Sequence, residues 1–354
     1  MDNPNTLLWL FFALGAAFGV AARASRFCLL RGLTQARGQD AETPRGSAPA
    51  LQAFALALAV AITGTQALAW TQHIDLSEAV QMRARFSPLG MLAGGVLFGA
   101  GMALARACGA RSVVLLAGGN LRALLTLLCL GLAAQAAMTG VLAPARQWLQ
   151  GWGAVTLAQP GAVAWGQGAL GAAGGALVVG VPVLALLAYA LRHPALRRSP
   201  VQWLGALAVG ALVALGWWLS TVGADPFDER RATTSISFIG PVAESLLYLQ
   251  LAVGRPLGVG AALVAGVLAG ALMAALAMRT ARWESFDSPA RTAASAVGGA
   301  LMGFGGVVAV GCSVGQGLSG LSTLAWASVP AVAGIVLGAL AVLQWRLVRQ
   351  RLAA

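Results

Sequence analysis

Long apolar stretches separated by short polar segments run through the whole chain. They cover residues 7–22, 51–70, 88–105, 121–143, 162–191, 201–221, 236–251, 257–278, 292–310 and 323–345. Most approach the length of about 20 residues that a helix needs to cross a bilayer. The stretch 236–251 contains Pro241 and Glu244 and predicts a half-span. The pattern therefore predicts an all-α polytopic integral membrane protein.

The overall composition excludes an ordinary soluble protein. Hydrophobic residues make up 58% of the chain and charged residues only 10%, whereas soluble proteins contain about 25% charged residues. The 46 glycines and 14 prolines follow no collagen-like period and form no low-complexity tract. We therefore expect them to punctuate helices inside the membrane. No basic helix or patch of interleaved basic and aromatic residues points to nucleic-acid binding.

The chain contains 23 arginines and no lysine, and its net charge is +12. The distribution of the arginines along the chain predicts its orientation in the membrane. The arginine clusters lie at 23–45, 192–198, 279–291 and 346–351. These segments are expected on the cytoplasmic side, together with the C-terminus. The N-terminus and the charge-balanced segments 71–87 and 222–235 are expected on the periplasmic side. Residues 1–22 lack a basic start, so they predict a first membrane helix and not a cleaved signal peptide.

An internal repeat links the two ends of the chain. The motif GGxLxGxGxxxAxxC occupies residues 94–108 and recurs at 298–312, an offset of 204 residues (312 − 108). On the predicted orientation the first copy starts outside and the second starts inside, so the repeats are inverted. Such repeats place their shared motif near the membrane midplane, at broken or re-entrant half-helices. We expect a single membrane domain with an N-terminal half of residues 1–160 and a C-terminal half of residues 161–354.

This arrangement predicts a shared site for two of the cysteines. Cys108 and Cys312 are expected within about 15 Å of each other, half the thickness of a bilayer. Continuous helices over 88–105 and 292–310 would each be roughly 27 Å long and would nearly span the apolar core. The glycines are therefore expected to bend or shorten both helices.

A shorter echo of the motif lies near the N-terminus. The pattern RxCxxR occurs at 26–31 and at 106–111, 80 residues apart (106 − 26). In both places a cysteine lies between two arginines, which indicates that the same site element occurs twice in the chain. The resulting candidates are Cys28, Cys108, Cys312, Arg26, Arg106 and Arg111.

The chemistry of these side chains favours a small, soft, sulfur-containing anion. A thiol is a weak hydrogen-bond donor and a polarizable contact, which suits a sulfur or selenium atom better than hard oxygen. Nearby arginines favour a negative charge. A purely structural interpretation is also open: cysteines as small packing residues, glycines as a helix-packing motif and arginines as positive-inside anchors. Cys129, inside an apolar run, is expected to be inert.

Four further residues are candidates for the site. Gly109 and Gly311 flank two of the cysteines and would leave backbone N–H groups reachable where a helix breaks. Glu244 is a carboxylate well inside an apolar stretch, either functional or capping a short helix. Gln316 could donate to a substrate oxygen or bridge helices. Nucleotide-binding, metal-binding and hydrolase motifs are absent from the sequence, so no cofactor, metal or ATP-driven step is expected.

The cysteine motifs resemble those of the YeeE/YedE family of bacterial inner-membrane sulfur-compound transporters, over nearly the whole chain. The segments that carry the resemblance are Arg26-Phe27-Cys28, Arg106-Ala107-Cys108-Gly109 and Gly311-Cys312-Ser313-Val314-Gly315-Gln316-Gly317. It implies an hourglass-like fold with a central constriction and uptake of thiosulfate. It also implies that Cys28, Cys108 and Cys312 relay the ion through transient S–H···S contacts. Relatives are associated with selenium metabolism and with a cytoplasmic TusA-like sulfurtransferase.

We therefore expect a permease and not an enzyme, located in the inner membrane and taking up thiosulfate or a close sulfur-containing anion. The same cysteines would also suit a membrane sulfurtransferase that carries sulfur as a cysteine persulfide. A transporter of selenium compounds and a structural subunit of a larger complex are two further hypotheses that the sequence leaves open.

Overall fold

The computed structural model describes residues 4–40, 42–44, 46–192, 194–222, 233–286 and 288–353. Most of the expected periplasmic segment 222–235 lies outside the described residues. Two strands, β1 (Arg85–Phe86) and β2 (Val155–Thr156), pair antiparallel, with Arg85 opposite Thr156. Otherwise the described part of the chain is helical, as the apolar pattern predicts.

The helices follow the apolar stretches closely. Their bounds are α1 Pro4–Ser25, α2 Leu29–Ala36, α3 Pro49–Trp70, η1 Val80–Met82, α4 Pro88–Ala105, α5 Gly109–Ala117, α6 Leu121–Met138, α7 Ala143–Gly151, α8 Ala162–Arg192, α9 Pro194–Arg197, α10 Pro200–Val222, α11 Ile239–Leu251, α12 Val259–Ala277, α13 Pro289–Val308, η2 Gly315–Gly320 and α14 Ser328–Ala353. The expected half-span corresponds to α11, which has 13 residues.

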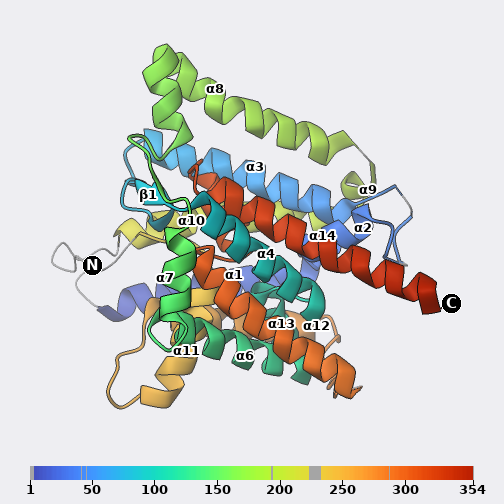
Figure 1. Cartoon of the computed structure of the whole chain (residues 1–354). Coiled ribbons are helices and arrows are strands. Elements are labelled where there is room, and N and C mark those ends of the chain that lie inside the picture. Colours follow the sequence, from blue (N-terminus) through green and yellow to red (C-terminus); the bar gives the residue numbers. More distant parts are fainter. Residues whose placement is uncertain are drawn as a thin grey trace.

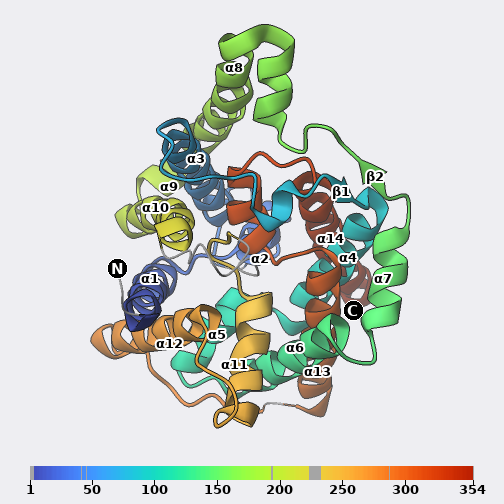
Figure 2. The ribbon, with the colours of Figure 1, turned by 90° about the vertical axis from the view of Figure 1, so that its left-hand side faces the viewer.

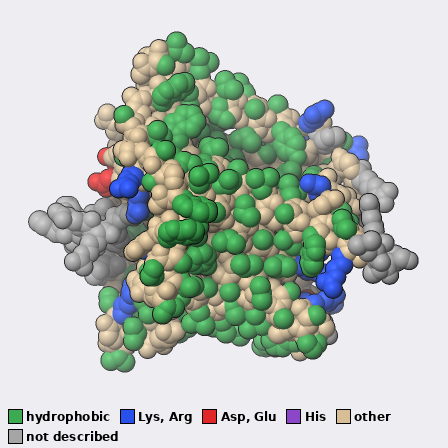
Figure 3. Space-filling model, viewed as in Figure 1, with side chains coloured by type: hydrophobic (Ala, Val, Ile, Leu, Met, Phe, Trp, Pro, Cys, Tyr) green, Lys and Arg blue, Asp and Glu red, His purple; other side chains and the backbone are tan. Residues whose placement is uncertain are grey.

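Eight helical segments of the described residues are long and apolar enough to cross a membrane, which confirms the prediction of a polytopic membrane protein. They are Asn5–Ala36, Pro49–Trp70, Pro88–Ala117, Leu121–Met138, Ala162–Arg192, Pro200–Thr221, Val259–Ala277 and Ser328–Arg349. Figure 3 shows hydrophobic side chains over the middle of the molecule and arginines gathered toward its ends. Such a surface matches an apolar bilayer core with charged residues in the headgroup regions.

The long helices pack mainly in pairs. The most extensive contacts join α1 to α12, α4 to α14, α6 to α13 and α3 to α10, and α4 also packs against α13. Figure 2 looks along many of these helices and shows the short α2 and α5 nearer the middle than α3, α12 or α13. By contrast, α8 lies on the outside against α3 (Figure 1). It bends at Gly171, whose φ of 63° interrupts the helix.

Glycines bring α4 and α13 into direct backbone contact in an antiparallel crossing. A Cβ added to Gly101 would lie 2.5 Å from the Gly298 carbonyl oxygen, and one added to Gly298 would lie 2.7 Å from the Gly101 oxygen. The same reciprocal contact joins Gly94 and Gly305, at 2.8 and 2.6 Å. The glycines are expected to bend or shorten these helices, and neither helix is interrupted at them. Both helices run unbroken, because the missing side chains serve close packing and not a break.

Candidate functional site

Each of the three motif cysteines follows a helix that ends in the same unusual way. The residue two positions earlier has a left-handed backbone, with φ of 52° at Arg26, 59° at Arg106 and 57° at Val310. This conformation is uncommon for residues other than glycine and a clear outlier for a β-branched residue such as valine. It ends the long helix, so each cysteine stands between the end of a long helix and the start of a short one.

The helices α2 and α5 begin directly after Cys28 and Cys108, and η2 begins three residues after Cys312. Two of the thiols accept backbone hydrogen bonds at these helix starts. Cys108 Sγ accepts from the Arg111 amide at 3.5 Å, and Cys312 Sγ accepts from the Gly315 amide at 3.2 Å. Cys28 is the residue that precedes α2, in an extended conformation. Unpaired N–H groups at a helix start attract negative charge. The backbone therefore offers an anion-favouring environment beside sulfur atoms.

The three cysteine motifs converge although they are far apart in sequence. The side chains of Cys28 and Cys108 interact, and the side chain of Cys108 also interacts with that of Ser313, the neighbour of Cys312. All three cysteines are buried, with Cys312 0% exposed. Cys129 is partly exposed and packs against Gly299, away from this cluster.

A small cavity of about 10 Å³, the cysteine cavity, lies at this meeting point. Its lining includes Cys28, Cys108 and Ser313. Its volume is close to the minimum that a single water molecule needs. Phe27 and Phe54 also line it, and their rings stack with centroids 5.5 Å apart. The space is therefore too small for an ion such as thiosulfate.

A much larger cavity of about 970 Å³, the vestibule, adjoins the cysteine cavity, and both are lined by Cys28 and Arg111. Arginines dominate its charged lining, which consists of Arg31, Arg37, Arg106, Arg111, Arg346 and Asp40. Asp40 partly offsets this charge and lies 4.0 Å from Arg31. The excess of arginine makes the vestibule attractive to anions.

The predicted arginines separate into two groups. Arg106 and Arg111 line the vestibule, whereas Arg26 points away, pairs with Glu42 at 3.4 Å and is 61% exposed. Arg346 lines the vestibule too, although its sequence position predicts only part of a charged tail. It reaches the end of α4 by donating to the Leu104 carbonyl at 3.1 Å. In the sequence, the position of Arg346 does not distinguish it from an ordinary charged residue at the end of a membrane helix.

Gln316 is buried and its amide group supports the broken end of α13. Its Nε2 donates to the carbonyls of Ala309 and Val310, at 2.9 and 3.0 Å. Because both donor positions are used by these two carbonyls, the amide has no N–H left for a substrate oxygen. Gly311 packs against Gln316, since a Cβ there would lie 2.9 Å from its Cγ, and its φ of 154° also disfavours a side chain. Both residues therefore pack within the fold of this motif.

Glu244 and Gly109 hold different positions. The Glu244 carboxylate lies against Gly258 and Gly260, at the start of α12, where a side chain at either glycine would overlap it. A carboxylate at a helix start stabilises the exposed N–H groups. It does not line the cysteine cavity or the vestibule. Gly109 begins α5, and a Cβ there would make only an ordinary 3.4 Å contact with Leu130.

Two aromatic side chains without a sequence signal complete the surroundings. Phe18 lines the cysteine cavity and packs against Phe238, with ring centroids 5.3 Å apart. The backbone of Phe238 in turn interacts with the Cys312 thiol. Phenylalanines are ordinary components of apolar helices, so only the packing distinguishes these two. Among the described residues, no three His, Cys, Asp or Glu side chains are grouped to hold a metal.

Comparison with known families identifies the class to which this architecture belongs. A family model described as sulphur transport matches residues 24–341. The chain therefore belongs to this sulfur-transport family, and the predicted resemblance is confirmed. The chain is similar to the thiosulfate transporter TsuA of Escherichia coli (strain K12), with 31% identity over 133 residues. The match covers 38% of this chain and only 36% of that relative's length.

Proposed function

We propose that the protein is an inner-membrane permease that takes up thiosulfate or a close sulfur-containing anion. The observation that carries the proposal is the convergence of three cysteine motifs beside an arginine-lined vestibule. Membership of the sulfur-transport family and similarity to a thiosulfate transporter support the same substrate class.

We infer that the two halves of the chain, 1–160 and 161–354, are inverted repeats. The glycine contacts support this inference. The repeat offset of 204 residues matches Gly94 to Gly298 (94 + 204) and Gly305 to Gly101 (305 − 204). The pair Gly94 and Gly305 therefore corresponds to the pair Gly298 and Gly101, which is also in contact. The crossing is therefore symmetric, and α4 and α13 run antiparallel. An axis between them in the membrane plane would relate the Cys108 motif to the Cys312 motif, as in transporters with inverted repeats.

The thiols form successive soft stations for the ion in this proposal. Thiosulfate carries a terminal sulfur atom that a polarizable thiol accommodates, while its oxygen atoms accept hydrogen bonds from arginine and backbone N–H groups. Cys28 and Cys108 interact directly, and Cys108 interacts with the neighbour of Cys312, so the ion moves over short distances between stations. Each station must bind weakly, because a deep energy well would trap the ion.

Passage requires the cysteine cavity to widen, since its volume of about 10 Å³ does not admit the ion. The stacked rings of Phe27 and Phe54 are the bulky side chains that must move. We place the N-terminus on the periplasmic side and the C-terminus and vestibule on the cytoplasmic side, because arginine-rich ends remain in the cytoplasm. The vestibule would then deliver the ion to the cytoplasm, where a TusA-like sulfurtransferase is a candidate acceptor.

Uptake of ³⁵S-thiosulfate into cells that lack other sulfate and thiosulfate importers tests the proposal. Cys28→Ala, Cys108→Ala and Cys312→Ala should each abolish most of the uptake. Cys129→Ala is the matched control, because Cys129 lies away from the cavity and should retain normal uptake. Expression of each variant in the membrane is measured in the same cells. Normal uptake by both Cys108→Ala and Cys312→Ala would contradict the relay.

Mass spectrometry separates the permease from a membrane sulfurtransferase. The permease predicts intact thiols at Cys28, Cys108 and Cys312 after turnover with thiosulfate. A stable added sulfur atom on one of them, required for turnover, would favour the persulfide enzyme. Competition by sulfite, sulfide and selenium analogues in proteoliposomes would define the substrate within the class.

A further inference from the structure

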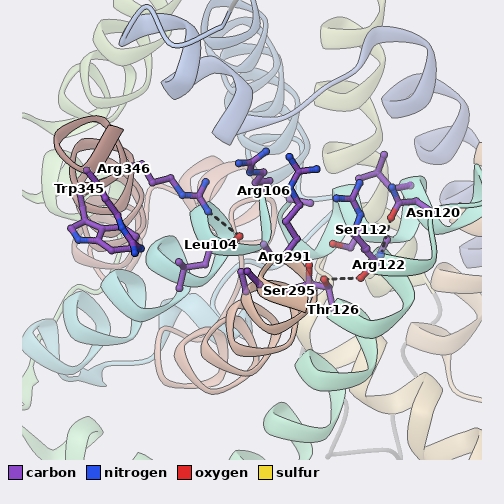
Figure 4. Close-up of a pocket in the computed structure, with 17 residues that line it drawn as sticks. Leu104, Arg106, Ser112, Asn120, Arg122, Thr126, Arg291, Ser295, Trp345 and Arg346 are labelled. Carbon is purple, nitrogen blue, oxygen red and sulfur yellow. Dashed lines mark hydrogen bonds between the residues drawn. The ribbon is translucent and has the colours of Figure 1, made fainter. Parts of the chain in front are cut away.

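A second basic cavity lies beside the vestibule and is separate from the cysteine cavity. Figure 4 shows the side chains that line this side pocket. It has a volume of about 610 Å³ and shares only Arg106 and Arg346 with the vestibule among its arginines. The ends of α4 and α14 meet the start of α6 and α13 there. Its arginines are Arg106, Arg122, Arg291, Arg346 and Arg349. None of the described residues that line it is acidic.

Positive charge dominates the surroundings of the side pocket. Glu284, outside the lining, accepts from Asn120 and lies 3.8 Å from Arg122. Two helices also begin at the pocket, α6 after its cap Asn120 and α13 after its cap Ser288. The N-termini of both helices carry a partial positive charge, which adds to the positive potential from the arginines.

An unpaired polar group lies in the wall of the side pocket. Ser112 is 0% exposed, lines the pocket and has no hydrogen-bond partner for its hydroxyl among the described residues. Buried hydroxyl groups are nearly always hydrogen-bonded, so an unpaired one calls for an occupant. Ser295 and Thr126 add two more hydroxyl groups to the lining. An oxygen-rich anion would supply acceptors for Ser112 and for the arginines together.

The outer wall of the side pocket has the features of a membrane interface. Trp345 lines the pocket and is 53% exposed, and the guanidinium group of Arg349 lies 5.5 Å from its ring centre. Tryptophan side chains favour the headgroup region, where the ring is partly apolar and the N–H is hydrated. The same wall therefore borders lipid headgroups, and basic pockets between membrane helices on the cytoplasmic side bind acidic headgroups.

We propose that the side pocket binds a phosphate group, independently of the transported anion. Arg122, Arg291, Arg346 and Arg349 would pair with its oxygen atoms, and Ser112 would donate its hydroxyl. The phosphate can belong to an anionic phospholipid headgroup or to a soluble phosphate, and the two sources share this chemistry. Bound phosphate would contact both the end of α14 and the start of α13. It would therefore stabilise the relative position of the last two long helices of the C-terminal half.

Two binding measurements on the full chain distinguish the sources. Native mass spectrometry measures retention of phosphatidylglycerol against phosphatidylethanolamine. Equilibrium binding of ³²P-labelled inorganic phosphate is measured in phosphatidylcholine nanodiscs. The double variant Arg291→Gln/Arg349→Gln removes two charges that line only the side pocket. At about fivefold to sixfold per arginine, binding by the double variant should weaken about thirtyfold.

The matched control is Arg197→Gln/Arg198→Gln, which removes two exposed arginines away from the pocket and should bind as the unmodified protein does. Ser112→Ala should weaken binding about threefold to tenfold without lowering thermal stability, because the hydroxyl has no partner among the described residues. If Arg291→Gln/Arg349→Gln loses retention of phosphatidylglycerol, the ligand is a lipid headgroup. If the same variant loses binding of inorganic phosphate, the ligand is a soluble phosphate. Binding of neither probe, or equal binding by the double variant and the unmodified protein, would overturn the proposal.

Discussion

The glycine crossing of α4 and α13 yields a sharp prediction about stability. A Cβ at Gly101 would lie 2.5 Å from the Gly298 oxygen, whereas ordinary contacts begin at 3.4 Å. The helices must therefore separate by about 0.9 Å (3.4 − 2.5). The opposing atom belongs to a backbone, which cannot rotate aside as a side chain can. Gly101→Ala should consequently destabilise the fold by about 1–3 kcal/mol, as overpacking does in other cores.

The repeat symmetry extends this prediction to the other half of the chain. Gly298→Ala meets the Gly101 oxygen at 2.7 Å and should cost a similar amount. Because both variants disturb the same crossing, the double variant should cost less than the sum of the single ones. Alanine is otherwise the better helix former by about 1 kcal/mol, so any destabilisation must come from the contact.

Thermal unfolding of purified protein in detergent measures this effect, with a fall in Tm of several degrees expected for Gly101→Ala and Gly298→Ala. Gly180→Ala is the matched control, because Gly180 lies in helix α8 and a Cβ there meets nothing within 4 Å. This control should be unchanged or slightly more stable. Equal Tm values for Gly101→Ala and Gly180→Ala would refute the crossing geometry.

Three further predictions concern single side chains. Gln316→Met removes the donor from the buried Ala309 carbonyl and the partly buried Val310 carbonyl and should lower stability by about 2–4 kcal/mol, measured by thermal unfolding; an unchanged Tm would contradict the capping role. Phe54→Ala widens the cysteine cavity and should admit smaller anions such as chloride into proteoliposomes, whereas unchanged exclusion would assign the barrier elsewhere. The hydrogen bond from Gln35 is the main interaction that holds the pKa of Asp40 below its ordinary value. The stabilisation from Asp40 should therefore be full at neutral pH and be lost as the pH falls through that lowered pKa, below about pH 4. Limited proteolysis of the 37–48 loop should then increase at acid pH in the unmodified protein and already at neutral pH in Asp40→Asn; resistance of that variant would contradict the linkage.

The helices and their order could be predicted from the sequence because they depend on local patterns. An apolar stretch of about 20 residues must form its own hydrogen bonds in lipid, and a helix does so without any partner. The motif at 94–108 and its copy at 298–312 are equally visible, since a repeat is a property of the chain alone. Cysteine spacing likewise identifies the three short segments that meet in the structure.

The tertiary structure decided how these segments face one another. Arg26 and Arg106 occupy equivalent places in the RxCxxR pattern, yet Arg26 pairs with Glu42 at the surface and Arg106 lines the vestibule. Their difference depends on which neighbouring helix lies opposite, and spacing along one segment does not contain that information. The roles of Gln316 as a backbone cap and of Glu244 beside α12 depend on the same packing.

The sequence by itself determined the membrane class, the helices, the repeat and the cysteine motifs. Only the tertiary structure decided that left-handed residues, and not glycines, end the helices before the cysteines. It also brought Phe54, Arg346 and Ser313 to the cavities. The physical reason is the range of the interactions: hydrophobicity and helix formation act over neighbouring residues, whereas a cavity is made by side chains that only helix packing brings together.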